Sequence, residues 1–90
     1  MDGKVINVGF GNIILASRML AVVNPKSSPA KKLKDDAKAN SRLVDATEGR
    51  RTRSVIVLDS GHVVLSSVQP ETIALRLATS GDGKIEARLP

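Results

Sequence analysis

Asp45-Ala-Thr-Glu-Gly-Arg-Arg-Thr-Arg53 leads directly into Ser54-Val-Ile-Val-Leu58. The second stretch is the most apolar run of the chain and is rich in β-branched residues, which favours a buried strand. The first places three arginines within four residues after Gly49, where the backbone can turn. We therefore expect this arginine loop (residues 45–53) to present guanidinium groups at the rim of a sheet. Such groups suit phosphate oxygens and base edges, although a merely solvated loop would have the same composition.

Composition limits the chain to one small domain. Its 90 residues include a single aromatic, Phe10, and no Cys, Trp or Tyr. The core must therefore be aliphatic, without disulfides or thiolate-bound metal, and this favours a homo-oligomer. The N-terminal residues and the short apolar runs resemble neither a secretory signal nor a membrane span. We expect a soluble protein of the cytoplasm with no membrane partner.

Positive charge is concentrated in one region. The chain carries +5 overall, but residues 18–53 hold ten basic and four acidic residues, a net charge of +6, and the remainder carries −1. A regional excess of this kind predicts an anionic partner. Nucleic acid is the commonest such partner, and an acidic protein or a lipid surface is an alternative.

The predicted fold is α+β, a small and mainly antiparallel sheet with two short helices. The apolar run 13–23 fits two strands with a polar corner at Ser17-Arg18, or one bent strand. The two runs around Asp59-Ser60-Gly61 read as a hairpin. Their continuous apolar sequences predict burial on both faces, with the second cover coming from another subunit. The expected strands lie at residues 4–8, within 13–23, at 42–46 (a short strand or an extended link), at 54–58 and at 62–68.

The first helix is predicted from Ser28, as N-cap, through Pro29 to about Asn40. It has a thin apolar stripe and a basic outer face. The stripe is Ala30, Leu33 and Ala37, and the basic face is Lys31, Lys32, Lys34 and Lys38. Asp35 and Asp36 on this helix are expected to pair with Lys31, Lys32 or Lys38 and not to bind metal.

The second helix is predicted to start at Pro70, with Glu71 favourable to the helix dipole. We expect Ile73, Ala74, Leu77 and Ala78 to form its apolar face, with Arg76 pointing elsewhere. The domain is predicted to span residues 1–80. Residues 81–90 are predicted to be a flexible tail, or alternatively a short added strand.

No residue pattern indicates an enzyme, a metal site or a cofactor. His62 is the only histidine and lacks the partners that a zinc site needs. Its neighbour Ser60 is a conceivable nucleophile, but adjacent turn residues rarely converge in that way. Gly9-Phe-Gly-Asn12 lacks the third glycine and the following helix of a dinucleotide-binding loop, so it is interpreted as a turn.

Three segments closely resemble the RemA family, small bacterial regulators of the extracellular matrix. They are Ile6-Asn-Val-Gly-Phe-Gly-Asn12, the arginine loop and Ser67-Val-Gln-Pro-Glu-Thr72, in the same order and at the same spacing. The similarity covers about residues 4–78. The resemblance implies a DNA-binding transcription regulator of biofilm-matrix genes, associated with the nucleoid and assembled into a closed homo-oligomeric ring. Seven or eight subunits are expected, although the number does not follow from the residues.

The resemblance also implies site residues. The DNA-contacting arginines of the family match Arg18, Arg50 and Arg51, whereas Arg53 could contact either DNA or a neighbouring subunit. Lys31, Lys32 and Lys34 are further candidates for contact with double-stranded DNA. Glu48 departs from the family, which often has an aromatic residue there, and its carboxylate could weaken the attraction of phosphate. A ring-shaped scaffold that binds RNA or an acidic protein is the competing hypothesis.

Overall fold

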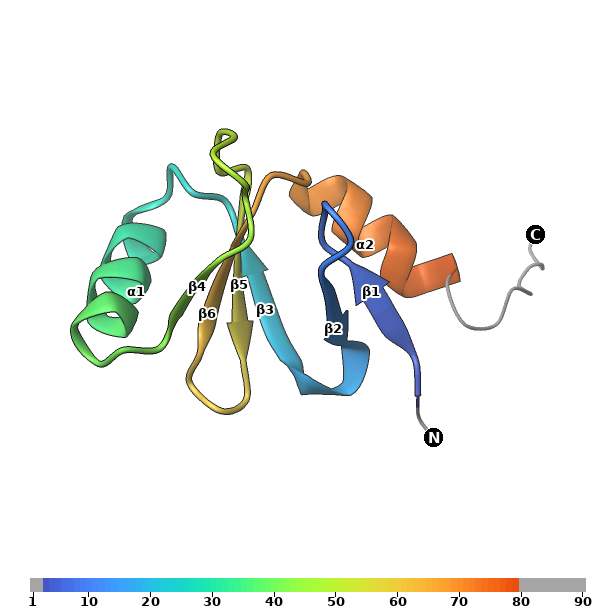
Figure 1. Cartoon of the computed structure of the whole chain (residues 1–90), viewed down its shortest axis with the longest axis horizontal. Coiled ribbons are helices and arrows are strands. Elements are labelled where there is room, and N and C mark those ends of the chain that lie inside the picture. The colour runs from blue at the N-terminus through green and yellow to red at the C-terminus, as the bar shows by residue number, and fades with distance from the viewer. Residues whose placement is uncertain (1–2, 80–90) are drawn as a thin grey trace.

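The computed structural model describes residues 3–79, and its centre is a four-stranded sheet in the order β3-β5-β6-β4. Helix α1 covers one face of this sheet, and a two-stranded hairpin with helix α2 covers the other (Figure 1). In chain order the elements are β1 (Val5–Asn7), β2 (Ile13–Leu15), a 3-10 helix (Ala16–Arg18), β3 (Met19–Val23), α1 (Ser28–Ala39), β4 (Leu43–Asp45), β5 (Ser54–Leu58), β6 (Val63–Ser66) and α2 (Pro70–Thr79).

The sheet is mixed. Strand β5 pairs antiparallel with both β3 and β6, as the hairpin prediction requires, whereas β4 runs parallel to β6 with Leu43 opposite Val63. Parallel strands need a crossover connection. Here α1 is the crossover from β3 to β4, which run parallel to each other, and β5 and β6 lie between these two strands in the sheet. The α+β class and the mainly antiparallel sheet are confirmed, while the parallel pair was not predicted.

The central strands are buried on both faces within one chain. Ile56 and Val64 pack with β1 and α2 in one core cluster. Val55 and Val63 pack against α1 in the other, together with Ala30. The expectation that another subunit covers the second face of β5 and β6 is therefore wrong. The thin stripe of α1 is sufficient because its small alanines let the helix approach the sheet closely.

The unpartnered aliphatic surface lies on the outer strands instead. Leu20 on β3 is 69% exposed, and Ile13 on β2 is 59% exposed. Leu15 and Val44, on β2 and β4, are also exposed. Strands β3 and β4 are the two edges of the larger sheet, so Leu20 and Val44 lie where a further chain could pair or pack.

The apolar run 13–23 forms two strands, with the polar corner folded into the 3-10 helix. Residues 9–12 form the predicted turn, and 42–46 contain strand β4. Strand β6 is shorter than predicted and ends at Ser66. The Ser66 hydroxyl donates to the Val8 carbonyl at 2.7 Å and accepts from the Val68 N–H at 3.0 Å, which turns the chain away from the sheet.

Helix α1 begins one residue earlier than predicted. Ser27 is the N-cap and Ser28 the first helical residue, because a turn in which the Ser27 N–H donates to the Asn24 carbonyl starts the helix sooner. At the other end the helix stops at Ala39. Ser41 adopts a φ of 58°, and the N–H of Arg42 donates to the Ala37 carbonyl at 2.7 Å. This is the Schellman arrangement that usually uses glycine.

Helix α2 buries less than its sequence predicted. Ile73 is buried and Leu77 half-buried, but Ala74 and Ala78 are exposed. The Arg76 guanidinium donates to the Asn7 carbonyl at 2.7 Å. The helix contacts β1 and β3, and it contributes Ile73 and Leu77 to the core on this side of the sheet. The predicted tail (81–90) lies outside the described residues.

No helix within residues 3–79 combines the length and the apolar character that crossing a bilayer requires.

Candidate nucleic-acid interface

Short-range hydrogen bonds hold the arginine loop at its start. The Asp45 carboxylate accepts the Thr47 N–H at 2.9 Å and the Thr47 hydroxyl at 2.6 Å. These bonds favour the ionised form and lower the pKa of Asp45 below its ordinary value of 3.8, the hydroxyl bond having the larger effect. The Thr47 side chain is buried, so the loop leaves the sheet in a fixed direction.

A tight turn then exposes the arginines. The N–H of Arg50 donates to the Thr47 carbonyl at 2.9 Å, and the two central residues, Glu48 and Gly49, have φ values of 53° and 80°. Two positive φ angles are typical of a type I′ turn, for which Asn-Gly is the preferred sequence. Glycine fits this geometry, whereas glutamate strains it. The loop ends where the N–H of Arg53 donates to the Ser66 carbonyl at 2.8 Å.

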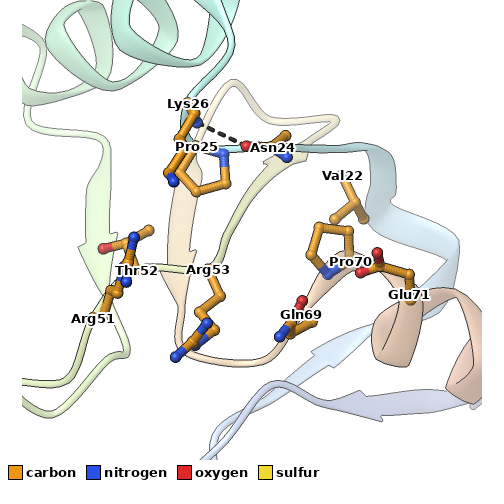
Figure 2. A pocket seen from close by; sticks show the side chains of 10 residues that line it. All are labelled: Val22, Asn24, Pro25, Lys26, Arg51, Thr52, Arg53, Gln69, Pro70 and Glu71. Atoms are coloured by element: carbon orange, nitrogen blue, oxygen red, sulfur yellow. Dashed lines mark hydrogen bonds between the residues drawn. The ribbon is translucent and has the colours of Figure 1, made fainter.

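A second segment brings another cation to the same place. Lys26, in the connection between β3 and α1, lines a pocket of about 620 Å³ together with Arg51 and Arg53. Figure 2 shows these side chains around the pocket, with the start of α2 on the other side. Glu71 is the one carboxylate among the lining residues. The Asn24 side chain accepts a hydrogen bond from the Lys26 N–H at 2.8 Å, and this bond fixes the connection.

A third segment adds an aromatic ring. The turn at residues 9–12 places Phe10 beside the loop, and the guanidinium carbon of Arg50 lies 5.9 Å from the centroid of its ring. Phe10, Arg50, Arg51 and Arg53 line a second hollow of about 400 Å³. Figure 1 shows the three segments at one end of the sheet, in blue, cyan and yellow-green.

We call Lys26, Arg50, Arg51 and Arg53 the cation cluster. All four side chains are exposed. Within residues 3–79 none of them forms an ion pair with a carboxylate, Glu48 included. The sequence identified the three arginines as candidates but not Lys26. The only sequence feature beside Lys26 is the turn-forming pair Asn24-Pro25.

Arg18 lies at the opposite end of the sheet. Its guanidinium forms an ion pair with the Asp59 carboxylate at 3.1 Å, and its carbonyl accepts the Asp59 N–H at 2.8 Å. Strand β5 separates Asp59 from Arg53, which corresponds to roughly 20 Å at about 3.3 Å per residue. One chain therefore does not bring Arg18 together with Arg50 and Arg51. Arg18 thus lies at a sheet end, in the polar corner between β2 and β3.

The helix lysines are largely occupied by local pairs. Lys31 pairs with Asp35 at 3.7 Å and Lys32 with Asp36 at 3.8 Å, as predicted. Both lysines are highly exposed, so each pair contributes little to stability. Lys34 is exposed on the same helix. These three lysines lie on α1 and line neither of the two hollows around the cation cluster.

The hairpin turn contains one contact that the sequence argument judged improbable. The Ser60 hydroxyl oxygen lies 2.7 Å from Nδ1 of His62, so the two turn residues do converge. Within residues 3–79 the imidazole has no further hydrogen-bond partner that would orient it as a base. Nor does that part of the chain gather three His, Asp or Glu side chains that could hold a metal ion.

Comparison with known proteins identifies the family of this chain and several bacterial relatives. The family described as RemA-like, or Extracellular matrix regulatory protein A-like, matches residues 5–77. A protein of Clostridium acetobutylicum, named only as a candidate regulatory protein, is 57% identical over 92% of this chain and 90% of its own length. A similarly named protein of Shouchella clausii is 55% identical over 97% of this chain and its whole length.

A Synechococcus protein with the same general name is 54% identical over 96% of this chain and 97% of its own length. The matched residues include 6–12, the arginine loop and 67–72, which are the three segments that carry the resemblance in the sequence. The chain belongs to the RemA-like family of extracellular matrix regulatory proteins.

Proposed function

We propose that this protein is a transcription regulator that binds double-stranded DNA through the cation cluster. The observation that carries the proposal is the gathering of four cations from two separate loops at one end of the sheet, none paired with a carboxylate among the described residues. Unpaired guanidinium forks bind phosphate oxygens with two parallel hydrogen bonds. On α1, by contrast, Lys31 and Lys32 pair with Asp35 and Asp36.

The cluster is suited to reading the DNA backbone. It sits on turns at the rim of the sheet, and no helix projects from it that would enter the major groove. Contacts of this kind position the protein through phosphates, while sequence preference comes from the shape and flexibility of the duplex. We expect A·T-rich or easily bent target sites and a strong dependence on salt.

Self-association completes the proposal. Exposed aliphatic residues on β2, β3 and β4 provide surfaces on different sides of the subunit, and contact between two different surfaces generates a ring when the rotation closes. A closed ring repeats the cation cluster and raises the effective concentration of each contact. Arg18 then forms a second row of cations, roughly 20 Å from the first, or about six base pairs along a duplex.

The family description points to extracellular-matrix genes as targets, which would place the protein on the cytoplasmic chromosome. Matrix-gene control is the part of the proposal that rests on the family alone. Recovery of genomic DNA with the protein at two salt concentrations identifies the target set.

The direct test compares two double variants that remove the same charge. We expect Arg50→Gln/Arg51→Gln to lose at least about tenfold in duplex affinity, at ~1 kcal/mol or more for each lost contact. Lys38→Gln/Arg42→Gln removes two cations away from the cluster and is expected to bind almost normally. Equal losses in the two variants would show a general charge effect and contradict the site.

Sedimentation of the same samples tests the assembly. We expect a mass several times that of the 9.5 kDa subunit, unchanged by either double variant. A subunit mass at micromolar concentration would contradict the ring. Stronger binding to an RNA duplex or to one acidic protein in nuclease-treated lysate would favour the competing scaffold function.

A further inference from the structure

Phe10 is the only aromatic residue of the chain, and the fold does not use it in either core cluster. Its side chain is 54% exposed. A domain with so few large side chains would normally bury its one aromatic ring, because burial of a ring is strongly favourable. Core packing therefore does not explain the position of Phe10, and we look for a role at the surface.

The backbone also holds Phe10 in an uncommon conformation. Its φ is 55°, a left-handed value that favours glycine or asparagine and is unusual for a bulky residue. Left-handed non-glycine residues tend to occur at binding sites, where the surrounding structure enforces them. Here the enforcement is visible, because the N–H of Val8 donates to the Asn12 carbonyl at 2.8 Å and closes the turn.

The turn is also held by hydrogen bonds within it and by close packing against another segment. The Asn7 side chain accepts the Gly9 N–H at 2.7 Å, and the Asn12 side chain donates to the Gly9 carbonyl at 3.0 Å. A β-carbon on Gly9 would lie 3.3 Å from the Ser67 hydroxyl, so the turn packs closely against the segment after β6. The ring is therefore presented from a rigid support.

The surroundings of the ring are positively charged. Arg50 lies over it, and Arg51 and Arg53 line the same hollow. A second copy that met this surface through the same surface would bring its own cation cluster, so the Phe10 side chain is disfavoured as a contact between two identical surfaces. A partner must offer both apolar surface and negative charge, and stacked bases between phosphate chains offer both.

We propose that Phe10 is a wedge that inserts between base pairs of duplex DNA from the minor groove, while the flanking arginines bind the adjacent phosphates. Apolar wedges of this kind unstack one base step and bend the duplex. Pyrimidine–purine steps such as TA unstack most easily, so they are the expected sites of insertion. This inference rests on the proposed DNA binding and adds to it a contact with the bases.

The test uses the full chain and a short duplex with 2-aminopurine beside a central TA step. Insertion unstacks the 2-aminopurine and raises its fluorescence. Phe10→Asn removes the ring but suits the left-handed backbone, so the turn is retained. Phe10→Met keeps an apolar side chain and is the matched control.

We expect the wild-type protein and Phe10→Met to raise the fluorescence and Phe10→Asn to leave it unchanged. Duplex affinity should fall about 5- to 100-fold in Phe10→Asn, the range found when base contacts to an aromatic ring are removed. The slope of log affinity against log salt should stay the same, because no phosphate contact is lost. Arg50→Gln should instead reduce that slope.

Three outcomes would overturn the wedge. Phe10→Asn could bind within twofold of the wild type with the same fluorescence change, which would leave the proposed DNA binding intact. A smaller sedimentation mass for Phe10→Asn would assign the ring to a subunit contact. Absence of duplex binding by the wild-type protein would overturn both the wedge and the proposed function.

Discussion

The guanidinium carbon of Arg50 lies 5.9 Å from the centroid of the Phe10 ring, and this contact joins two segments forty residues apart. An exposed cation–π contact contributes about 0.5–1 kcal/mol, too little to account for the placement of the only aromatic residue of the chain. The contact also favours one orientation of the Arg50 guanidinium. Pre-orientation of this kind reduces the entropy lost when a phosphate binds.

Glu48 is predicted to destabilise the turn in the arginine loop and to weaken the attraction of this loop for phosphate. Glu48→Gln should raise duplex affinity several-fold, because it removes a carboxylate two residues from Arg50. Glu48→Asn should do the same and also stabilise the protein by about 0.5–1 kcal/mol, since asparagine suits a positive φ. Duplex titration and urea denaturation measure the two effects. Unchanged affinity in Glu48→Gln would show that this carboxylate lies away from the DNA.

Asp45 is predicted to titrate below its ordinary pKa of 3.8, because the folded protein stabilises its ionised form through Thr47. A lowered folded pKa gives stability that is present above the unfolded pKa and lost as the pH falls through the folded pKa. The Thr47 amide resonance, followed by NMR from pH 6 to pH 2, should therefore shift with a midpoint below 3.8. A midpoint at or above that value would contradict the hydrogen bonds at the start of the loop.

Ser41 is predicted to limit the stability of α1. Ser41→Gly should stabilise the protein by roughly 0.5–1 kcal/mol in urea denaturation, because glycine adopts the left-handed conformation at this helix end without strain. Ala39→Gly, within the last turn of the same helix, should destabilise by a similar amount. Stabilisation by both glycines, or by neither, would argue against the Schellman end.

The Arg18–Asp59 pair offers a test of Arg18 as a DNA contact. Both side chains are partly exposed, so Asp59→Asn should change the free energy of unfolding by less than about 1 kcal/mol. If Arg18 contacts phosphate, releasing it from Asp59 should raise duplex affinity. The rise should disappear in Asp59→Asn/Arg18→Gln. A rise that persists in the double variant would come from the lost carboxylate alone.

Local sequence predicted the elements better than their arrangement. The β-branched run at Ser54–Leu58 and the glycine-containing turn after it are local signals of a hairpin, and that prediction is confirmed. The parallel pairing of β4 with β6 depends on how α1 crosses the sheet, which no single segment encodes. Burial of β5 on both faces was predicted, but its second cover comes from α1 and not from another subunit.

The candidate site was predictable in the same partial way. The three arginines lie within four consecutive residues, so they could be identified as candidates before the fold was known. Lys26 and Phe10 join it only through tertiary structure, and neither carries a local signal stronger than a turn. Arg18 differs from Lys26 and Phe10. The resemblance groups it with Arg50 and Arg51, but within one subunit Arg18 lies at the opposite end of the sheet from those two arginines.

The most direct test of DNA binding through the cation cluster is the salt dependence of duplex affinity. The slope of log affinity against log salt counts the phosphates that the protein neutralises, at about 0.9 for each. We predict a steep slope for the wild-type protein. Arg50→Gln/Arg51→Gln should lower it by about 1.8 for every subunit that touches the duplex. An unchanged slope in that double variant would contradict the central claim, whatever its affinity.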